Sequence, residues 1–385
     1  MGLWRSASDP AVSTVPRPTP RPADIGLLWF AGLALLVIMS AWLAGLTLQG
    51  VVAAWPKFPA DFLVFWTAAR APPASIYDVA ALTHAQAWAV VDLQDKRPFA
   101  YPPTFLLLIE PFGRLPLLPA LLAWSALGIG AFCAVSRQLV GRAWPLMLVS
   151  PAFICAAATG QVTFIVGAGL MAGVLLAPKR PLLAGLAFGL VATLKPQAAL
   201  MVPLALMVGG HWRVLLTATL CGAAVGGASL ALHRELWSQW LNVLPAFSRI
   251  IETDAWDISI GVTPRIFAHQ MGLQGTPGEI AIIAVGAALG VAAVVAAFRR
   301  TAPVQRYGAL CVGYLLVSPY ALWYELALLQ PVAVALLLQR DWKSRGAGVV
   351  AYTLFGRIFA VAAVAVLLLC NRPLAPARCR SARAA

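Results

Sequence analysis

Long runs of apolar residues, separated by short segments that carry most of the charges, dominate this sequence. The first run, residues 25–48, contains no charged residue, and a stretch of that length can cross the hydrocarbon core of a bilayer. Of the 385 residues, 61% are hydrophobic and 11% are charged, against roughly 45–50% and about 25% in soluble domains. Because a backbone in lipid must satisfy its own hydrogen bonds, the pattern predicts an all-α polytopic membrane protein with about 11–12 transmembrane helices. It excludes a soluble enzyme and a disulfide scaffold.

The lysines and arginines fall mostly in short segments that follow every second apolar run, so the positive-inside rule assigns sides to the loops. Residues 49–100 and 233–278 are then external loops. We expect a flexible cytoplasmic leader over 1–24, one transmembrane domain over 25–371 and a basic tail over 372–385. Spans beyond the first are expected near 117–136, 144–159, 162–177, 181–194, 196–209, 213–232, 279–298, 307–318, 321–339 and 346–370.

Two shorter segments fit neither a span nor a simple loop. Residues 102–113 contain three prolines and would reach only about 18 Å as a helix, so we expect a broken or re-entrant segment there. Residues 75–91 have the periodicity of an amphipathic helix that lies on the bilayer surface. The first run has no cleavage signature after it and is therefore interpreted as a retained anchor.

The net charge of +14, from 28 basic and 14 acidic residues, orients the spans and gives no reason to expect nucleic acid as a partner. The six cysteines are scattered without a C-x-x-C pair. The sequence also lacks a Walker loop, a G-x-G-x-x-G fingerprint, an H-E-x-x-H motif and a G-x-S-x-G elbow. We therefore expect no metal and no cofactor.

The unusual polar residues gather at the external ends of the predicted spans, and a one-sided polar cluster suits a membrane enzyme better than a channel. Asp61 is either a helix N-cap or a general base, since desolvation raises the pKa of a carboxyl group and strengthens it as a base. Lys195 either binds a lipid phosphate or pairs with Asp61 or Glu325. The candidate pocket residues are Tyr101, Gln161, Gln197, Tyr320, Tyr324 and Glu325.

Six motifs in order give the chain a resemblance to a known family. They are D-F-x-x-F-W-x-A-A-R (61–70), I-Y-D (76–78), F-A-Y-P-P-T-F (99–105), T-G-Q-V (159–162), A-G-L-A-F-G-L with T-L-K-P-Q (184–197) and S-P-Y-A-L-W-Y-E (318–325). From about residue 25 to 340 the chain resembles glycosyltransferase family 87, which includes mannosyltransferase-like enzymes of GT-C-type architecture with amphipathic helices in their external loops.

The resemblance implies an inverting enzyme that takes a sugar from a polyprenyl-phosphate donor. Asp61 would be the general base, Lys195 would bind the donor phosphate, and Gln161, Gln197, Tyr324 and Glu325 would shape the sugar pocket. The acceptor would be a lipid or a glycan on the periplasmic side of a bacterial inner membrane, with membrane lipid as the surrounding partner. Two alternatives remain open from the residues alone, a flippase for lipid-linked sugars and an assembly subunit without activity.

Overall fold

The computed structural model describes residues 22–53, 55, 60–87, 98–253, 259–300, 302–339, 341–353 and 357–369. The predicted all-α membrane-type fold is confirmed over these residues, which form helices and a single isolated antiparallel bridge between Gly261 and Leu322. The predicted tail over 372–385, and the predicted leader apart from residues 22–24, lie outside the described residues.

The helices are mostly short, and several have a proline in the first turn, where its missing N–H leaves no hydrogen bond unmade. In the following, η marks a 3₁₀-helix. The N-terminal half contains α1 (Pro22–Ala53), α2 (Ala60–Ala68), η1 (Pro73–Ser75), α3 (Val79–Ala85), α4 (Pro103–Gly113), α5 (Leu117–Val140), η2 (Gly141–Val149), α6 (Pro151–Thr159), α7 (Thr163–Leu176) and α8 (Pro181–Leu194). The C-terminal half contains η3 (Pro196–Ala199), α9 (Val202–Val208), α10 (Trp212–Leu232), α11 (Arg234–Thr253), α13 (Pro264–Gln270), α14 (Pro277–Arg300), α15 (Pro303–Val317), η4 (Trp323–Leu329), α16 (Gln330–Leu337), α17 (Trp342–Tyr352) and α18 (Arg357–Leu369).

Among the described residues, three helices are long and apolar enough to cross a membrane by themselves: Leu117–Val149, Trp212–Leu232 and Pro277–Arg299. The pair α6 and α7 becomes a fourth if it counts as one span bent by 120°. Several predicted spans are therefore built from broken or shorter pieces. The run over 144–159 starts in η2 and continues in α6, and the run over 346–370 is divided between α17 and α18.

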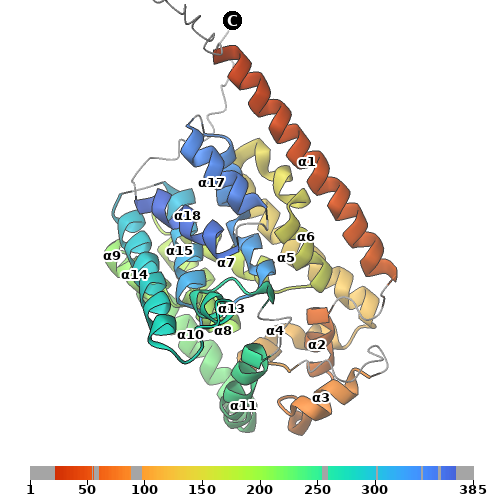
Figure 1. The fold of residues 1–385 in the computed structure, drawn as a ribbon. Coiled ribbons are helices and arrows are strands. Elements are labelled where there is room, and N and C mark those ends of the chain that lie inside the picture. The colour runs from red at the N-terminus through yellow and green to blue at the C-terminus, as the bar shows by residue number, and fades with distance from the viewer. Residues whose placement is uncertain are drawn as a thin grey trace, which may run out of the picture.

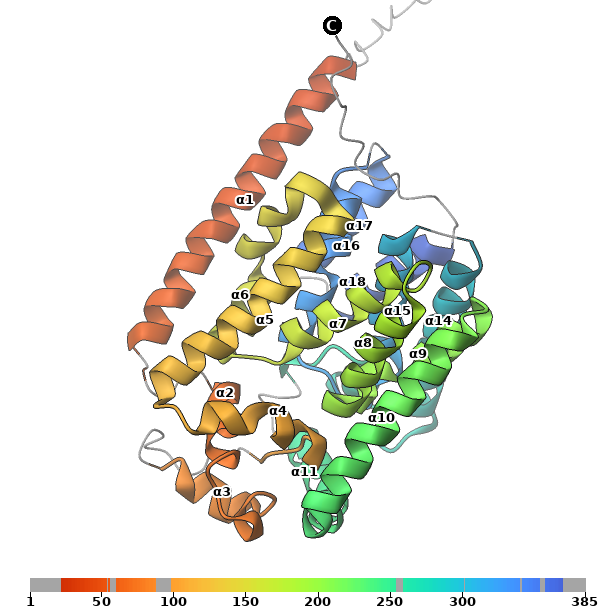
Figure 2. The same cartoon turned by 180° about the vertical axis from the view of Figure 1, so that it is seen from behind.

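The helices form a bundle, with α1 lying along its outside (Figures 1 and 2). The short helices α2, α3 and α4 gather at one end of this bundle together with α11, and α17 lies at the opposite end (Figure 1). Thus helices from both segments predicted as external loops, 49–100 and 233–278, occupy the same end. We call it the site end, because the candidate residues described next come from the segments that meet there.

Candidate active site

Asp61 lies in the first turn of α2 and is half-buried. The N-terminal turn of a helix favours a negative charge, because the unpaired backbone N–H groups point toward it. The residues that follow, Phe62 and Leu63, are fully buried and anchor α2 in the hydrophobic core. Asp61 is not the N-cap that the sequence offered as one alternative, because α2 begins at Ala60 and Asp61 lies within the helix.

The T-G-Q segment lies directly against α2. The helix α6 ends at Gly160, whose φ of 69° is a left-handed conformation that suits glycine. A Cβ at Gly160 would come within 2.6 Å of the Phe62 Cβ, and the Trp124 indole donates a hydrogen bond of 2.9 Å to the Gly160 carbonyl. The next residue, Gln161, is buried, and within the described residues its side-chain oxygen accepts no hydrogen bond.

Lys195 and Glu325 form a buried ion pair, with side chains 6% and 1% exposed. Pro196 disfavours a helical conformation at the residue before it, so α8 ends at Leu194 and Lys195 has a non-helical backbone. The ammonium group also lies 5.8 Å from the centroid of the Tyr314 ring. The second carboxylate oxygen of Glu325 is buried and accepts no hydrogen bond among the described residues. Of the two ion-pair partners considered for Lys195, the structure has Glu325.

Three tyrosines, Tyr101, Tyr320 and Tyr324, lie around the charged groups of the site. The Gln197 amide donates a hydrogen bond of 3.4 Å to the Tyr320 hydroxyl. Desolvation raises the pKa of Tyr101 well above its usual range, and the charges of Glu325 and Asp61 raise it further. Tyr320 has a raised pKa for the same first reason, with Glu325 as the next cause. Both phenols therefore stay protonated near neutral pH and can donate hydrogen bonds.

Tyr324 lies near both charged parts of the site, since its phenol is within electrostatic reach of Asp61 and of Glu325. Tyr101, which lies just before α4, is also within electrostatic reach of both Asp61 and Glu325. The helices α6 and α7, on either side of Gln161, pack against η4, which contains Glu325. All eight predicted site residues thus lie on segments that meet at the site end, and the direct side-chain contacts among them include Lys195 with Glu325 and Gln197 with Tyr320.

Several residues that brace the site were not among the predicted ones. The Thr104 hydroxyl donates to the Thr193 carbonyl and ties the start of α4 to the end of α8. From α11, the Trp240 indole donates a hydrogen bond of 3.0 Å to the Ala100 carbonyl, and Phe247 stacks edge-on with Tyr320 at 5.0 Å. The spacing of the inward residues of α11 was a usable signal, because buried Leu236 and Val243 recur with Trp240 and Phe247 at helical intervals.

No group of three or more His, Cys, Asp or Glu side chains that could hold a metal ion occurs in the described part of the chain. The charged groups of the site are two carboxylates and one ammonium, surrounded by phenols and amides. This set can accept a proton, neutralise an anion and hydrogen-bond to hydroxyl groups. These are the requirements of a group transfer between hydroxyl-rich molecules.

A comparison with known protein families identifies the kind of group transfer. The sequence model of glycosyltransferase family 87 matches residues 99–319, more than half of the chain. The chain belongs to glycosyltransferase family 87. Searches of curated proteins and of solved structures returned no match.

Membership makes the chain a membrane glycosyltransferase and identifies its substrates as a sugar donor and an acceptor. The range that matches family 87 includes Tyr101, Gln161, Lys195 and Gln197. It ends at Pro319, so Asp61 and the segment from Tyr320 to Glu325 lie outside it. The roles of the individual side chains therefore depend on the geometry of this chain.

Proposed function

We propose that this family 87 glycosyltransferase moves a sugar from a polyprenyl-phosphate donor to a lipid or glycan acceptor at the periplasmic face of a bacterial inner membrane. The observation that carries the proposal is the convergence of Asp61, Gln161 and the Lys195–Glu325 pair from four separate segments at one end of the bundle. A polyprenyl donor suits a site in an apolar helical bundle, because its hydrocarbon chain can stay in the membrane while the sugar reaches the polar residues.

In the proposed reaction, Asp61 is the general base. The acceptor hydroxyl gives its proton to the Asp61 carboxylate, and its oxygen forms a new bond to the anomeric carbon of the donor sugar. The bond from that carbon to the phosphate oxygen breaks, and the lipid phosphate leaves with the electron pair. Attack on the face opposite the leaving group inverts the anomeric configuration. The position of Asp61 in the first turn of α2 favours the ionised form that a base needs.

Lys195 is proposed to bind the leaving phosphate. An ammonium group has three N–H donors, so Lys195 can keep its bond to Glu325 and still bind a phosphate oxygen. Glu325 would hold the ammonium in place before the donor arrives. Charge-assisted hydrogen bonds of this kind are about twice as strong as neutral ones, and the apolar surroundings weaken them less than water would.

The sugar is proposed to lie near two buried oxygens of the site that accept no hydrogen bond among the described residues, Oε1 of Gln161 and Oε2 of Glu325. Buried polar atoms are nearly always hydrogen-bonded, because an unpaired one costs about 1–3 kcal/mol. Sugar hydroxyls are suitable donors for both atoms. Tyr101, Tyr320, Tyr324 and Gln197 complete the proposed pocket with further donors and with flat aromatic faces.

Replacing Asp61 with asparagine tests this assignment, because the amide keeps the size of the side chain but cannot accept a proton. We expect Asp61→Asn to lower the rate of transfer by about 10²–10⁴-fold, the usual contribution of a general base. The measurement uses purified protein with polyprenyl-phosphate sugars and follows the formation of a glycosylated acceptor. Asp78→Asn is the matched control, because Asp78 caps α3 at the same end through the Ala81 N–H.

Transfer at the wild-type rate by Asp61→Asn would refute the base assignment. If the wild-type protein moves lipid-linked sugars across vesicle membranes and forms no covalent product, the flippase alternative is correct instead. Asp78→Asn should keep wild-type activity, because asparagine is as good an N-cap as aspartate.

A further inference from the structure

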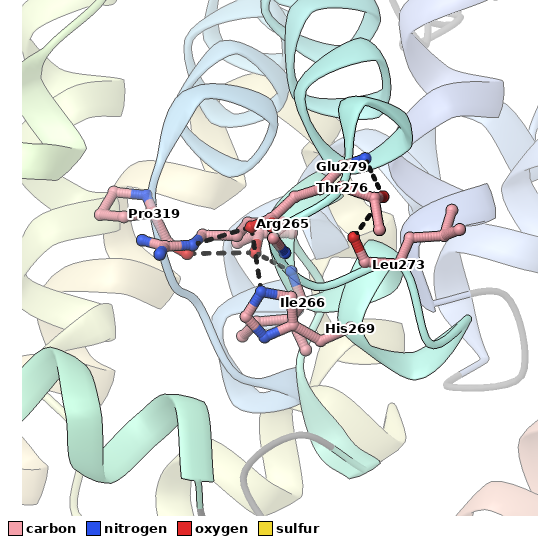
Figure 3. Close-up of polar contacts among 9 residues, drawn as sticks. Arg265, Ile266, His269, Leu273, Thr276, Glu279 and Pro319 are labelled. Atoms are coloured by element: carbon pink, nitrogen blue, oxygen red, sulfur yellow. Dashed lines mark hydrogen bonds and ion pairs between the residues drawn. The ribbon is translucent and has the colours of Figure 1, made fainter.

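A second charged cluster lies beside the active site, between α13 and α14 (Figure 3). Glu279, in the first turn of α14, accepts hydrogen bonds from the His269 Nε2 at 3.0 Å and from the Gly275 N–H at 2.6 Å. The Arg265 Nε lies 3.4 Å from the same carboxylate. The Glu279 side chain is 11% exposed and that of Arg265 34%, so the carboxylate is enclosed while the guanidinium reaches the surface.

A cavity of about 440 Å³ opens next to this cluster. Its polar lining consists of Arg265, Thr276, Ser318 and the paired carboxylate of Glu279. Its apolar wall includes Ile280 and Ile283 of α14 together with Leu316 of α15. We call it the Arg265 cavity. Asp61 and Lys195 are not among its lining residues, so it is separate from the proposed catalytic groups.

The mouth of the Arg265 cavity adjoins an apolar surface. Ile280 is 71% exposed, and Val285 and Val291 continue this exposed apolar surface along α14. In a helix long enough to cross the membrane, such side chains face lipid hydrocarbon. The cavity therefore has the Arg265 guanidinium beside the first turn of α14 and an exposed apolar surface that continues along α14.

We infer that the Arg265 cavity binds the phosphate headgroup of an anionic membrane lipid, whose hydrocarbon chain lies along the exposed apolar side chains of α14. The charge of Arg265 selects the headgroup, since a guanidinium has five N–H donors in a planar fork that matches phosphate and can hold more than one acceptor. Glu279 is already bonded to His269 and Gly275 and fixes the position of Arg265.

Lipid retention by the full-length protein tests this inference independently of sugar transfer. The protein is purified in detergent, stripped of lipid and titrated with phosphatidylglycerol, and bound lipid is counted by native mass spectrometry. We expect Arg265→Gln to weaken the tightest site about tenfold or more, because hydrogen bonds to charged groups contribute about 1.5–3 kcal/mol. Arg249→Gln, which removes an exposed arginine of α11, should leave this site unchanged.

A second variant separates the cavity from the stability of the charged cluster. Ile283→Trp adds bulk at the apolar wall, keeps Arg265 and Glu279, and should also weaken the tight site about tenfold or more. Equal retention of phosphatidylglycerol by wild type and both variants would overturn the inference. So would equal retention of diacylglycerol, which lacks the phosphate, or displacement of the lipid by millimolar inorganic phosphate, which would indicate a site for free anions. A protein inactive in sugar transfer can still give the expected lipid result, so the two proposals can fail separately.

Discussion

At the scale of single residues, the buried ion pair between Lys195 and Glu325 matters for both stability and the site. Both side chains are almost completely buried, and they come from segments 130 positions apart in sequence. Removing a charge from water is expensive, and a partner offsets that cost only while both charges are present. The pair therefore fixes the end of α8 against η4, and with it the two segments that contribute four of the six residues of the proposed sugar pocket.

Single and double substitutions of this pair should separate its structural role from its catalytic role. We expect Lys195→Met and Glu325→Leu each to lower the free energy of unfolding by about 3–5 kcal/mol, because each leaves one buried charge unpaired. The double variant should recover most of this stability, since two apolar side chains of similar volume replace the pair. Transfer activity should be lost in all three. Denaturation in detergent and a transfer assay measure the two effects, and an unstable double variant or an active one would contradict the prediction.

Among the structural elements, the break between α6 and α7 determines where the start of α2 can lie. Gly160 ends α6 with a positive φ and lets Phe62, the neighbour of Asp61, approach to a distance at which a Cβ would clash. The sequence predicted that Asp61 and Gln161 both lie at the external side of the spans. It did not predict that the two segments touch, because contacts between distant segments leave no local periodicity.

Gly160→Ala should therefore affect activity more than its conformational cost explains. The left-handed conformation costs a non-glycine residue roughly 1–2 kcal/mol, and the added methyl group would push Phe62 and α2 away. A displacement of about 1 Å can reduce a rate about 10²-fold, so we expect the transfer rate to fall at least about tenfold. Gly210→Ala is the matched control, because Gly210 also follows the end of a helix with a positive φ, of 68°, and has no atom within 4 Å of the added Cβ.

Thermal unfolding and transfer rates of the two glycine variants test this argument together. The control should lose a similar conformational contribution to stability and keep full activity. If Gly210→Ala loses as much activity as Gly160→Ala, general destabilisation explains the loss, and the contact with Phe62 has no special role.

For the whole molecule, the apolar pattern was sufficient to predict an all-α membrane fold, and the ordered motifs predicted the family and the residues to examine. The pattern was less informative about helix lengths, since proline and glycine break several apolar runs, such as 144–159, into pieces. The Arg265, His269 and Glu279 cluster was missed, because its members are spread over a loop and the start of a span. Only the structure shows that Arg265 and His269 both contact the Glu279 carboxylate.

The two ends of the bundle are expected to face opposite sides of the membrane, and this can be measured in cells. Helix α11 lies at the site end and α17 at the opposite end (Figure 1). Ser238 of α11 and Lys343 of α17 are both exposed, so cysteines at these positions can react. In intact bacterial cells, a membrane-impermeant maleimide should label Ser238→Cys and leave Lys343→Cys unlabelled until the inner membrane is permeabilised, with the unsubstituted protein giving the background from native cysteines. Labelling of Lys343→Cys alone in intact cells would place the site end in the cytoplasm, and the donor and acceptor would then have to be sought on that side.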